Sequence, residues 1–335
     1  MKKAVLISFA FTLLLSVTIP IQTQDRELVV YSARNEHLIE PLFKKYESET
    51  GVKIRFITDK AGALIQRLKA EGKRSPADIL ITVDAGNLWY AAGQGLLKPV
   101  SSSLLNERIP PHLRDPAGAW FGLSVRARTI VYSTDRVDPG ELSTYEALGE
   151  PNWRKRLVLR TSKKVYNQSL TAMLIAQHGI EKTENIVRSW VGNLAFAPYS
   201  SDTKVMEAIL AGQGDVGIVN TYYFGRLLKD DPDLPLALFW PDQDGGGVHI
   251  NVSGAGVVAT SRKTELAVDF LEWLASPEAQ EVFARSNLEF PASPGVDVDP
   301  IVGSWGTFKA STMNLAQAGE LQTEAIKLMD RAGYR

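Results

Sequence analysis

The sequence predicts an α/β protein of two lobes. Its 335 residues are too many for one ordinary compact domain and suit two. Hydrophobic residues make up 44% of the chain, enough for each lobe to bury a core of its own. Beyond the amino terminus, segments with strand-like spacing alternate with segments of helical spacing, an order typical of parallel sheets flanked by helices.

The first residues have the pattern of an export signal. Lys2 and Lys3 precede a mostly apolar run, 4–20, and polar residues follow it. The run is short for a bilayer span, and a strand pattern begins at once. We therefore expect a signal peptide at residues 1–24, with an approximate cleavage site. The mature protein is expected to lie in the periplasm without being embedded in the membrane. A retained membrane anchor is the alternative.

The first half of the mature chain alternates strand and helix. Strands are expected at 27–32, 52–57 and 78–82, and helices at 35–50, 61–71 and 87–95. The first two helices are each followed by a glycine, a residue that favours helix ends. The third strand is apolar throughout, as in a sheet covered on both faces.

A second α/β series follows a strand-like run at 120–132. Its expected strands are 157–160, 215–219 and 253–259, and its expected helices are 168–178, 204–211, 224–228, 264–274 and one beginning near Pro277. Proline is common at the first position of a helix. The three glycines at 245–247 predict a flexible break before the last strand. The periodicity of the sequence does not identify a ligand.

Composition excludes several classes of protein. Lys+Arg 37 against Asp+Glu 38 leave a net charge of -1, which argues against nucleic acid as a partner. The chain has no cysteine, which rules out a lipoprotein anchor, disulfides and thiolate metal sites. It also lacks the motifs of serine hydrolases, zinc proteases and P-loop proteins, so we predict that it is not an enzyme.

Several segments together resemble the periplasmic ferric-ion-binding proteins of bacterial iron ABC transporters. The segments are Val30-Tyr-Ser-Ala-Arg34, Ser75-Pro-Ala-Asp78, the run 120–132, Asn220-Thr-Tyr-Tyr-Phe-Gly-Arg226 and Ser276-Pro-Glu-Ala-Gln280. The resemblance spans roughly residues 27–310. The last segment is typical of many extracellular binding proteins, whereas the tyrosine pair in its context is far more specific.

This resemblance implies a periplasmic-binding-protein type II fold. In this clamshell each lobe is a mixed sheet flanked by helices, and two crossing strands form the hinge. By that analogy the N-terminal lobe comprises 26–126 plus 253–302, and the C-terminal lobe 127–252 plus 303–335. Ligand is expected in the cleft between the lobes. The expected partners are an inner-membrane ABC permease and its ATPase, and the protein is expected to be a monomer.

The resemblance also implies that the cargo is Fe(III), a hard cation that prefers oxygen ligands. Tyr222 and Tyr223 match the family's ligand pair, and Tyr166 matches a third tyrosine found in one branch. All three are expected just after strands, at the edge where α/β sheets bind ligands. Asn35 stands where some members have a histidine ligand. His37 is a further candidate, with a surface or capping role as its alternative.

A tyrosine site of this kind implies a synergistic anion that completes the iron coordination. Carbonate or bicarbonate is expected, with phosphate or citrate as alternatives. Arg34 and Arg126 resemble the family's anion-binding arginines, and guanidinium groups can hold planar anions in bidentate fashion. Arg128 shares a strand face with Arg126, with surface ion pairing as its alternative. Import of a polyamine, thiamine or an oxyanion by the same fold is the alternative function.

Overall fold

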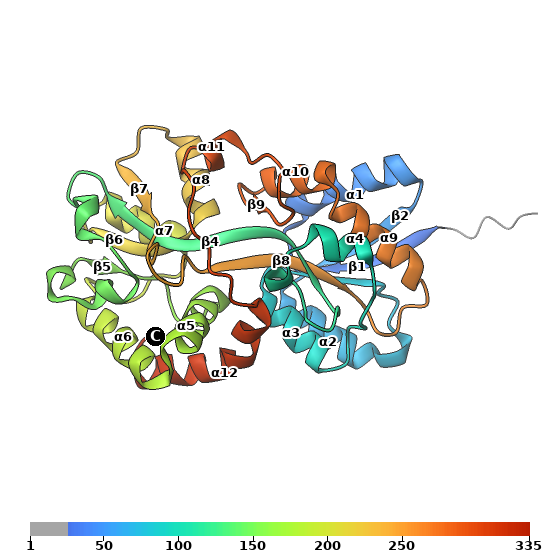
Figure 1. The fold of residues 1–335 in the computed structure, drawn as a ribbon, viewed down its shortest axis with the longest axis horizontal. Coiled ribbons are helices and arrows are strands. Elements are labelled where there is room, and N and C mark those ends of the chain that lie inside the picture. Colours follow the sequence, from blue (N-terminus) through green and yellow to red (C-terminus); the bar gives the residue numbers. More distant parts are fainter. Residues whose placement is uncertain (1–25) are drawn as a thin grey trace, which may run out of the picture.

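The computed structural model describes residues 26–335, so the predicted signal peptide, 1–24, lies outside the described residues. Two lobes lie side by side, with the N-terminal lobe on the right in Figure 1. This arrangement confirms the predicted α/β fold of two lobes. Among the described residues, no helix has the length and apolar character needed to span a membrane.

The N-terminal lobe is built on the predicted alternation. Its first elements are β1 (Glu27–Ser32), α1 (Glu36–Thr50), β2 (Lys53–Thr58), α2 (Ala61–Glu71), β3 (Ile79–Thr82) and α3 (Ala85–Gly93). Strand β1 pairs in parallel with both β2 and β3. Helix α1 ends at Gly51, whose φ of 70° is the left-handed conformation that closes many helices.

Two long buried strands, β4 (Phe121–Ser133) and β8 (Ile250–Val257), run between the lobes (Figure 1). One half of β4 pairs antiparallel with β8, and its other half, from Arg128, pairs antiparallel with β6 (Val216–Asn220). The sheet order is β2-β1-β3-β8-β4-β6-β5, where β5 is Leu157–Val158. Two short strands, β7 (Leu236–Phe239) and β9 (Phe290–Pro291), also pair with β4. One mixed sheet therefore continues through both lobes.

The other helices pack on this sheet or on one another. They are α4 (Ser103–Arg108), α5 (Val165–His178), α6 (Ile180–Asn193), α7 (Asp202–Leu210), α8 (Thr221–Asp230), α9 (Thr264–Leu274), α10 (Pro277–Arg285), α11 (Pro300–Gly303) and α12 (Leu315–Arg331). Short 3-10 turns lie at 72–74, 111–113, 139–141, 146–149 and 151–153. Helices α4, α6, α11 and α12 were not among the predicted helices.

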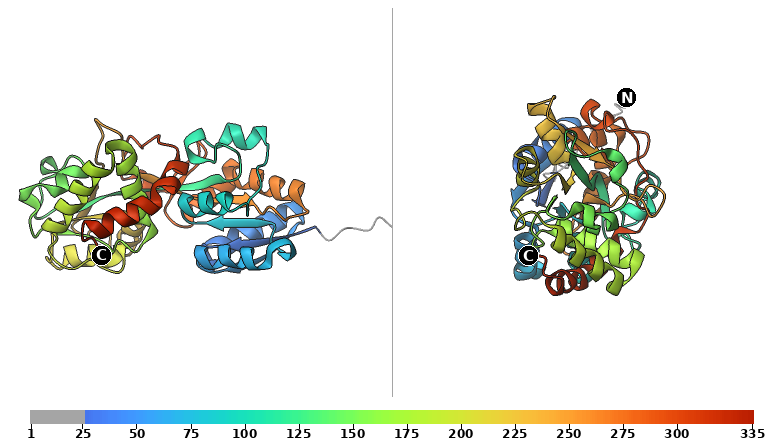
Figure 2. Two further views of the ribbon diagram at one scale, coloured as in Figure 1. Left: turned by 90° about the horizontal axis from the view of Figure 1, so that it is seen from below. Right: turned by 90° about the vertical axis from the view of Figure 1, so that its left-hand side faces the viewer.

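Helix α12 bridges the two lobes, because it packs against both α3 and α5 (Figure 2). A Cβ at Gly319 would lie 2.6 Å from the Trp89 side chain, so only glycine lets α12 approach α3 this closely. The lobe boundaries implied by the resemblance stay a prediction.

Candidate metal site

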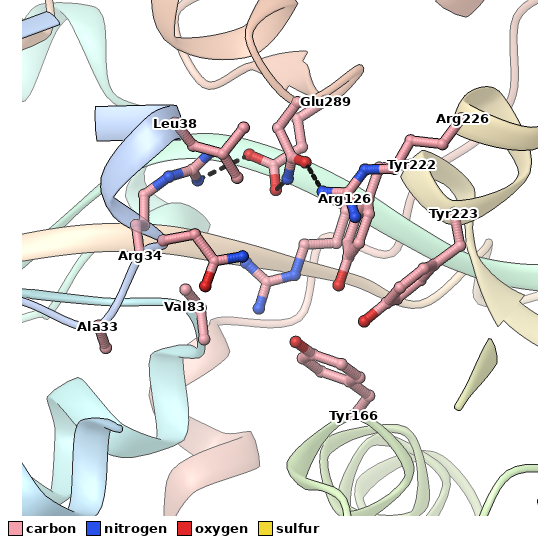
Figure 3. A pocket seen from close by; sticks show the side chains of 12 residues that line it. Ala33, Arg34, Leu38, Val83, Arg126, Tyr166, Tyr222, Tyr223, Arg226 and Glu289 are labelled. Atoms are coloured by element: carbon pink, nitrogen blue, oxygen red, sulfur yellow. Dashed lines mark hydrogen bonds and ion pairs between the residues drawn. The ribbon is translucent and has the colours of Figure 1, made fainter. Parts of the chain in front are cut away.

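A cavity of about 130 Å³ is lined by three tyrosines and by residues of both lobes. Its lining is Ala33, Arg34, Asn35, Leu38, Val83, Arg126, Tyr166, Tyr222, Tyr223, Arg226, Asn287 and Glu289. In Figure 3 the three tyrosine hydroxyl groups point into the same space. The structure thus brings together five of the seven predicted site residues: Arg34, Arg126, Tyr166, Tyr222 and Tyr223.

The tyrosines lie on the first turns of helices rather than in loops. Tyr222 and Tyr223 belong to α8, which begins directly after β6 ends at Asn220, and Tyr166 belongs to α5. Neighbouring side chains of a helix diverge by about 100°, whereas those of a strand point to opposite faces. The ring centroids of Tyr222 and Tyr223 are only 4.4 Å apart, so both side chains can line the same cavity.

Gly225, one turn further along α8, explains why this helix can lie close to the opposite side of the cavity. A Cβ there would lie 2.9 Å from both Leu288 and Trp305. Any larger residue would push α8 away from the segment that carries Asn287 and Glu289.

Two of the three arginines at the cavity, Arg34 and Arg126, have unused hydrogen-bond donors. Arg34 donates from Nη1 to Ser253 Oγ over 2.7 Å and pairs with Glu289 Oε2 at 3.0 Å. Within residues 26–335, its Nε and Nη2 have no hydrogen-bond partner although they are buried, and neither does Nη2 of Arg126. Buried donors are nearly always satisfied, so these groups fit an anion with several oxygens.

Glu289 is a site residue that the sequence analysis missed. Its carboxylate accepts hydrogen bonds from Ser124 Oγ and, over 2.7 Å, from Asn287 Nδ2. Burial alone would raise the pKa of Glu289, but Arg34 and Arg126 hold it below its ordinary value, so the group is ionised. No motif could have indicated this residue, because Arg34 lies 255 positions earlier in the chain.

Arg226 is the second residue whose role was missed, although it lies in the tyrosine motif. Its guanidinium carbon is 5.2 Å from the ring centroid of Tyr222 and 5.5 Å from that of Tyr223. Its Nη2 donates to the side-chain oxygen of Asn287. The cavity therefore has a third cation against the tyrosine rings, in a geometry typical of cation–π contacts.

The cavity disfavours ionised phenols while no cation is bound. Burial raises the pKa of Tyr166, and the neighbouring Tyr223 raises it further, while Arg126 lowers it in part. Burial also raises the pKa of Tyr222 well above its ordinary value, with added contributions from Tyr166 and Tyr223. Both phenols are thus protonated near neutral pH, and a highly charged metal ion could replace those protons.

His37 is not brought to the cavity. It lies exposed on the first turn of α1 and is not among the residues that line the cavity, whereas Asn35, two residues earlier, is. Among residues 26–335, no group of three or more His, Asp and Glu side chains is arranged to hold a metal ion. At the cavity, the three tyrosines are the candidate metal ligands.

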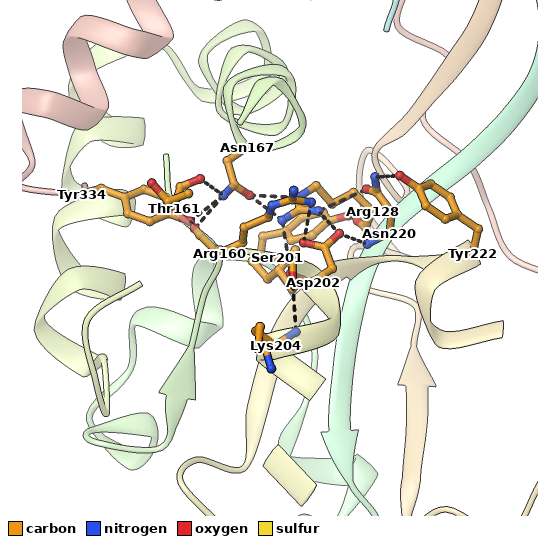
Figure 4. Close-up of polar contacts among 12 residues, drawn as sticks. Arg128, Arg160, Thr161, Asn167, Ser201, Asp202, Lys204, Asn220, Tyr222 and Tyr334 are labelled. Atoms are coloured by element: carbon orange, nitrogen blue, oxygen red, sulfur yellow. Dashed lines mark hydrogen bonds and ion pairs between the residues drawn. The ribbon is translucent and has the colours of Figure 1, made fainter. Parts of the chain in front are cut away.

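Arg128 is also not a cavity residue, contrary to the expectation from its i, i+2 spacing with Arg126. It is buried in a polar cluster (Figure 4), where Nε and Nη2 donate to Asn167 Oδ1 over 2.9 and 2.6 Å. Its Nη1 pairs with Asp202 Oδ2 at 3.1 Å. The reason is that β4 leaves β8 after Ala127 and pairs with β6 from Arg128 onward.

Comparisons with known proteins show the family to which the chain is related. Residues 74–314 match the family of bacterial extracellular solute-binding proteins. The chain is 42% identical over 93% of its length, and 88% of the relative's, to iron uptake protein A1 of Synechocystis sp.. It is 25% identical to the Fe(3+)-binding periplasmic protein of Serratia marcescens, over 92% of this chain and 91% of that one.

Two solved structures show the same likeness. The Trichodesmium protein (IdiA, FutA) in complex with iron and citrate ligands is 42% identical with a TM-score of 0.89, and the match covers 92% of this chain and 100% of that one. The ferric binding protein from Campylobacter jejuni is 36% identical with a TM-score of 0.85, at the same coverage. The chain belongs to the ferric-iron-binding family of bacterial extracellular solute-binding proteins.

Proposed function

We propose that this protein captures Fe(III) in the periplasm as a monomer and delivers it to an inner-membrane ABC permease and its ATPase. Tyr166, Tyr222 and Tyr223 bind the ion as phenolates, and Arg34 and Arg126 hold a synergistic anion. The observation that carries the proposal is that three phenols from two helices line one cavity together with arginines that have unused donors.

The charges of the lining residues support an iron ion accompanied by a dianion. Three phenolates neutralise the three positive charges of Fe(III). Arg34, Arg126 and Arg226 contribute three positive charges and Glu289 one negative charge, which leaves two positive charges for an anion. Carbonate has this charge and suits a cavity of about 130 Å³. Citrate, which accompanies iron in the Trichodesmium structure, is the competing anion.

Iron binding can be tested by colour and retention. Metal-free protein given Fe(III) and bicarbonate is expected to turn orange-red, because phenolate-to-iron charge transfer absorbs visible light. One iron per chain is expected to remain after desalting, and omission of bicarbonate is expected to weaken retention. A colourless protein that loses its iron would overturn the proposal, and stabilisation by a polyamine, thiamine or an oxyanion alone would favour another cargo.

Iron affinity is expected to fall steeply with decreasing pH. Because the pKa values of Tyr166 and Tyr222 are raised, iron must displace a proton from each phenol when it binds. Protons compete with the metal, so affinity should drop about tenfold per pH unit for each proton displaced. Competition with a chelator of known pH behaviour measures this slope. An affinity that does not change with pH would contradict phenolate ligation.

A further inference from the structure

Arg160 places a fourth cation beside the tyrosines, and it is not among the residues that line the cavity. The residue is only 6% exposed. Its guanidinium carbon lies 5.2 Å from the ring centroid of Tyr166 and 5.8 Å from that of Tyr223. No motif in the sequence predicted a role for this residue.

The charge of Arg160 is only partly compensated. Its Nη1 lies 3.4 Å from Asp202 Oδ1, and within residues 26–335 neither Nε nor Nη1 has a hydrogen-bond partner. Asp202 is itself shared, since its Oδ2 pairs with Arg128 at 3.1 Å and accepts from the backbone N–H of Asn220 over 3.0 Å. Two buried arginines thus share one carboxylate, and a net positive charge remains near the phenols.

Burial does not neutralise this arginine. Burial alone would lower the pKa of Arg160, but Asp202 and Tyr223 raise it above its ordinary value. An arginine side chain in any case keeps its proton in proteins. The guanidinium is therefore a permanent charge against the rings of Tyr166 and Tyr223.

The backbone of Arg160 is held by two other parts of the fold (Figure 4). Its carbonyl oxygen accepts hydrogen bonds from Asn167 Nδ2 over 2.8 Å and from the hydroxyl of Tyr334 over 2.5 Å. Asn167 follows Tyr166 on α5, and Tyr334 is the penultimate residue of the chain. These contacts hold the backbone of Arg160 beside Tyr166 before any ligand binds, as preorganised electrostatic stabilisation requires.

We infer that Arg160 is a positioning residue that stabilises the iron-bound phenolates of Tyr166 and Tyr223 with a fixed positive charge. This inference rests on the proposed function. A bound phenolate carries negative charge a few ångströms from the guanidinium, in a buried setting where attraction is far stronger than in water. A purely structural arginine would need its donors satisfied, and two of those of Arg160 are not.

Exchange of Arg160 for glutamine tests the inference through the colour of the iron complex. Without the cation the donor orbitals of the phenolates rise in energy, so the charge-transfer band should move to longer wavelength. The affinity for iron, measured by competition with citrate, should fall about tenfold, which corresponds to about 1.4 kcal/mol. Arg160→Lys retains the charge and should recover most of both properties.

Arg156→Gln is the matched control, because Arg156 is also stacked on an aromatic ring, that of Trp153, but pairs with Asp215 and is not a site residue. Arg156→Gln should leave the charge-transfer band and the iron affinity unchanged. Asp202→Asn removes the carboxylate that offsets Arg160, so it should move the band to shorter wavelength. This opposite sign separates a charge effect from general damage.

The outcomes distinguish this inference from the proposed function. If wild-type protein gives no coloured iron complex, the proposed function fails. If wild type is coloured and folded Arg160→Gln has the same band and affinity, only the inference fails. If Arg160→Gln does not yield folded protein, the spectrum of Asp202→Asn is the test. A charge-transfer band of Asp202→Asn that stays in place or moves to longer wavelength overturns the inference.

Discussion

Tyr223→Phe is expected to remove or strongly shift the visible band of the iron complex and to lower iron affinity by more than about a hundredfold. Changes outside the ligand shell of a metal typically cost about 10–100-fold, so loss of a ligand should exceed that range. Phenylalanine keeps the ring, whose centroid lies 4.4 Å from that of Tyr222, and removes only the oxygen. The effect should therefore come from ligation rather than from packing.

Tyr199→Phe is the matched control for this exchange. Tyr199 lies in an isolated β-bridge, its hydroxyl donates to Gln213 Oε1 over 2.9 Å, and it does not line the cavity. Its variant should bind iron as wild type does. Equal iron affinity and an equal spectrum for Tyr223→Phe and Tyr199→Phe would exclude Tyr223 as a ligand.

Arg128→Met is expected to reduce the free energy of unfolding by about 3 kcal/mol, with iron ligands left in place, because it leaves a buried carboxylate without its main partner. Asp202 is fully buried and Arg128 is 2% exposed, so water cannot compensate for the lost ion pair. The variant also leaves the amide oxygens of Asn167 and Asn220 without their donor. Urea unfolding monitored by circular dichroism measures the change.

Arg285→Met provides the comparison for a surface pair. Arg285 pairs with Glu281 at 3.0 Å on the exposed face of α10, and both side chains are more than 40% exposed. Such pairs contribute about 0–1 kcal/mol, so this variant should unfold almost as wild type does. A loss for Arg128→Met no larger than that for Arg285→Met would contradict the assignment of the buried cluster as a stabilising centre.

The elements predicted between residues 27 and 95 agree with the structure to within two residues because local signals there are clear. Gly51 ends α1, and its positive φ has a direct physical reason. In the C-terminal lobe the signals overlap. Gly179 separates α5 from α6 by a single residue, so it indicated the end of one helix and concealed the start of the next.

Only those parts of the site that lie in short sequence motifs could be predicted. The pair Tyr222-Tyr223 lies in one motif, and the structure brings Tyr166 to it. Arg128 was expected at the cavity because it shares a strand face with Arg126. It lies elsewhere because β4 changes partners between Ala127 and Arg128.

Residues that only tertiary contacts bring to the site could not be predicted. Glu289 reaches the site through a turn in which Leu288 has a φ of 54°, a conformation that is uncommon for leucine and that the sequence does not signal. Arg160 has a neighbour at the penultimate position, Tyr334, which is 174 residues away in the chain.

The most direct test of phenolate ligation is an anomalous difference map, recorded above the iron absorption edge from crystals grown with Fe(III) and bicarbonate. We predict one strong peak in the cavity, within bonding distance of the phenolic oxygens of Tyr166, Tyr222 and Tyr223, with an anion between the iron and the arginines. A peak bonded to none of these three oxygens, or no iron in the cavity, would contradict the proposed function.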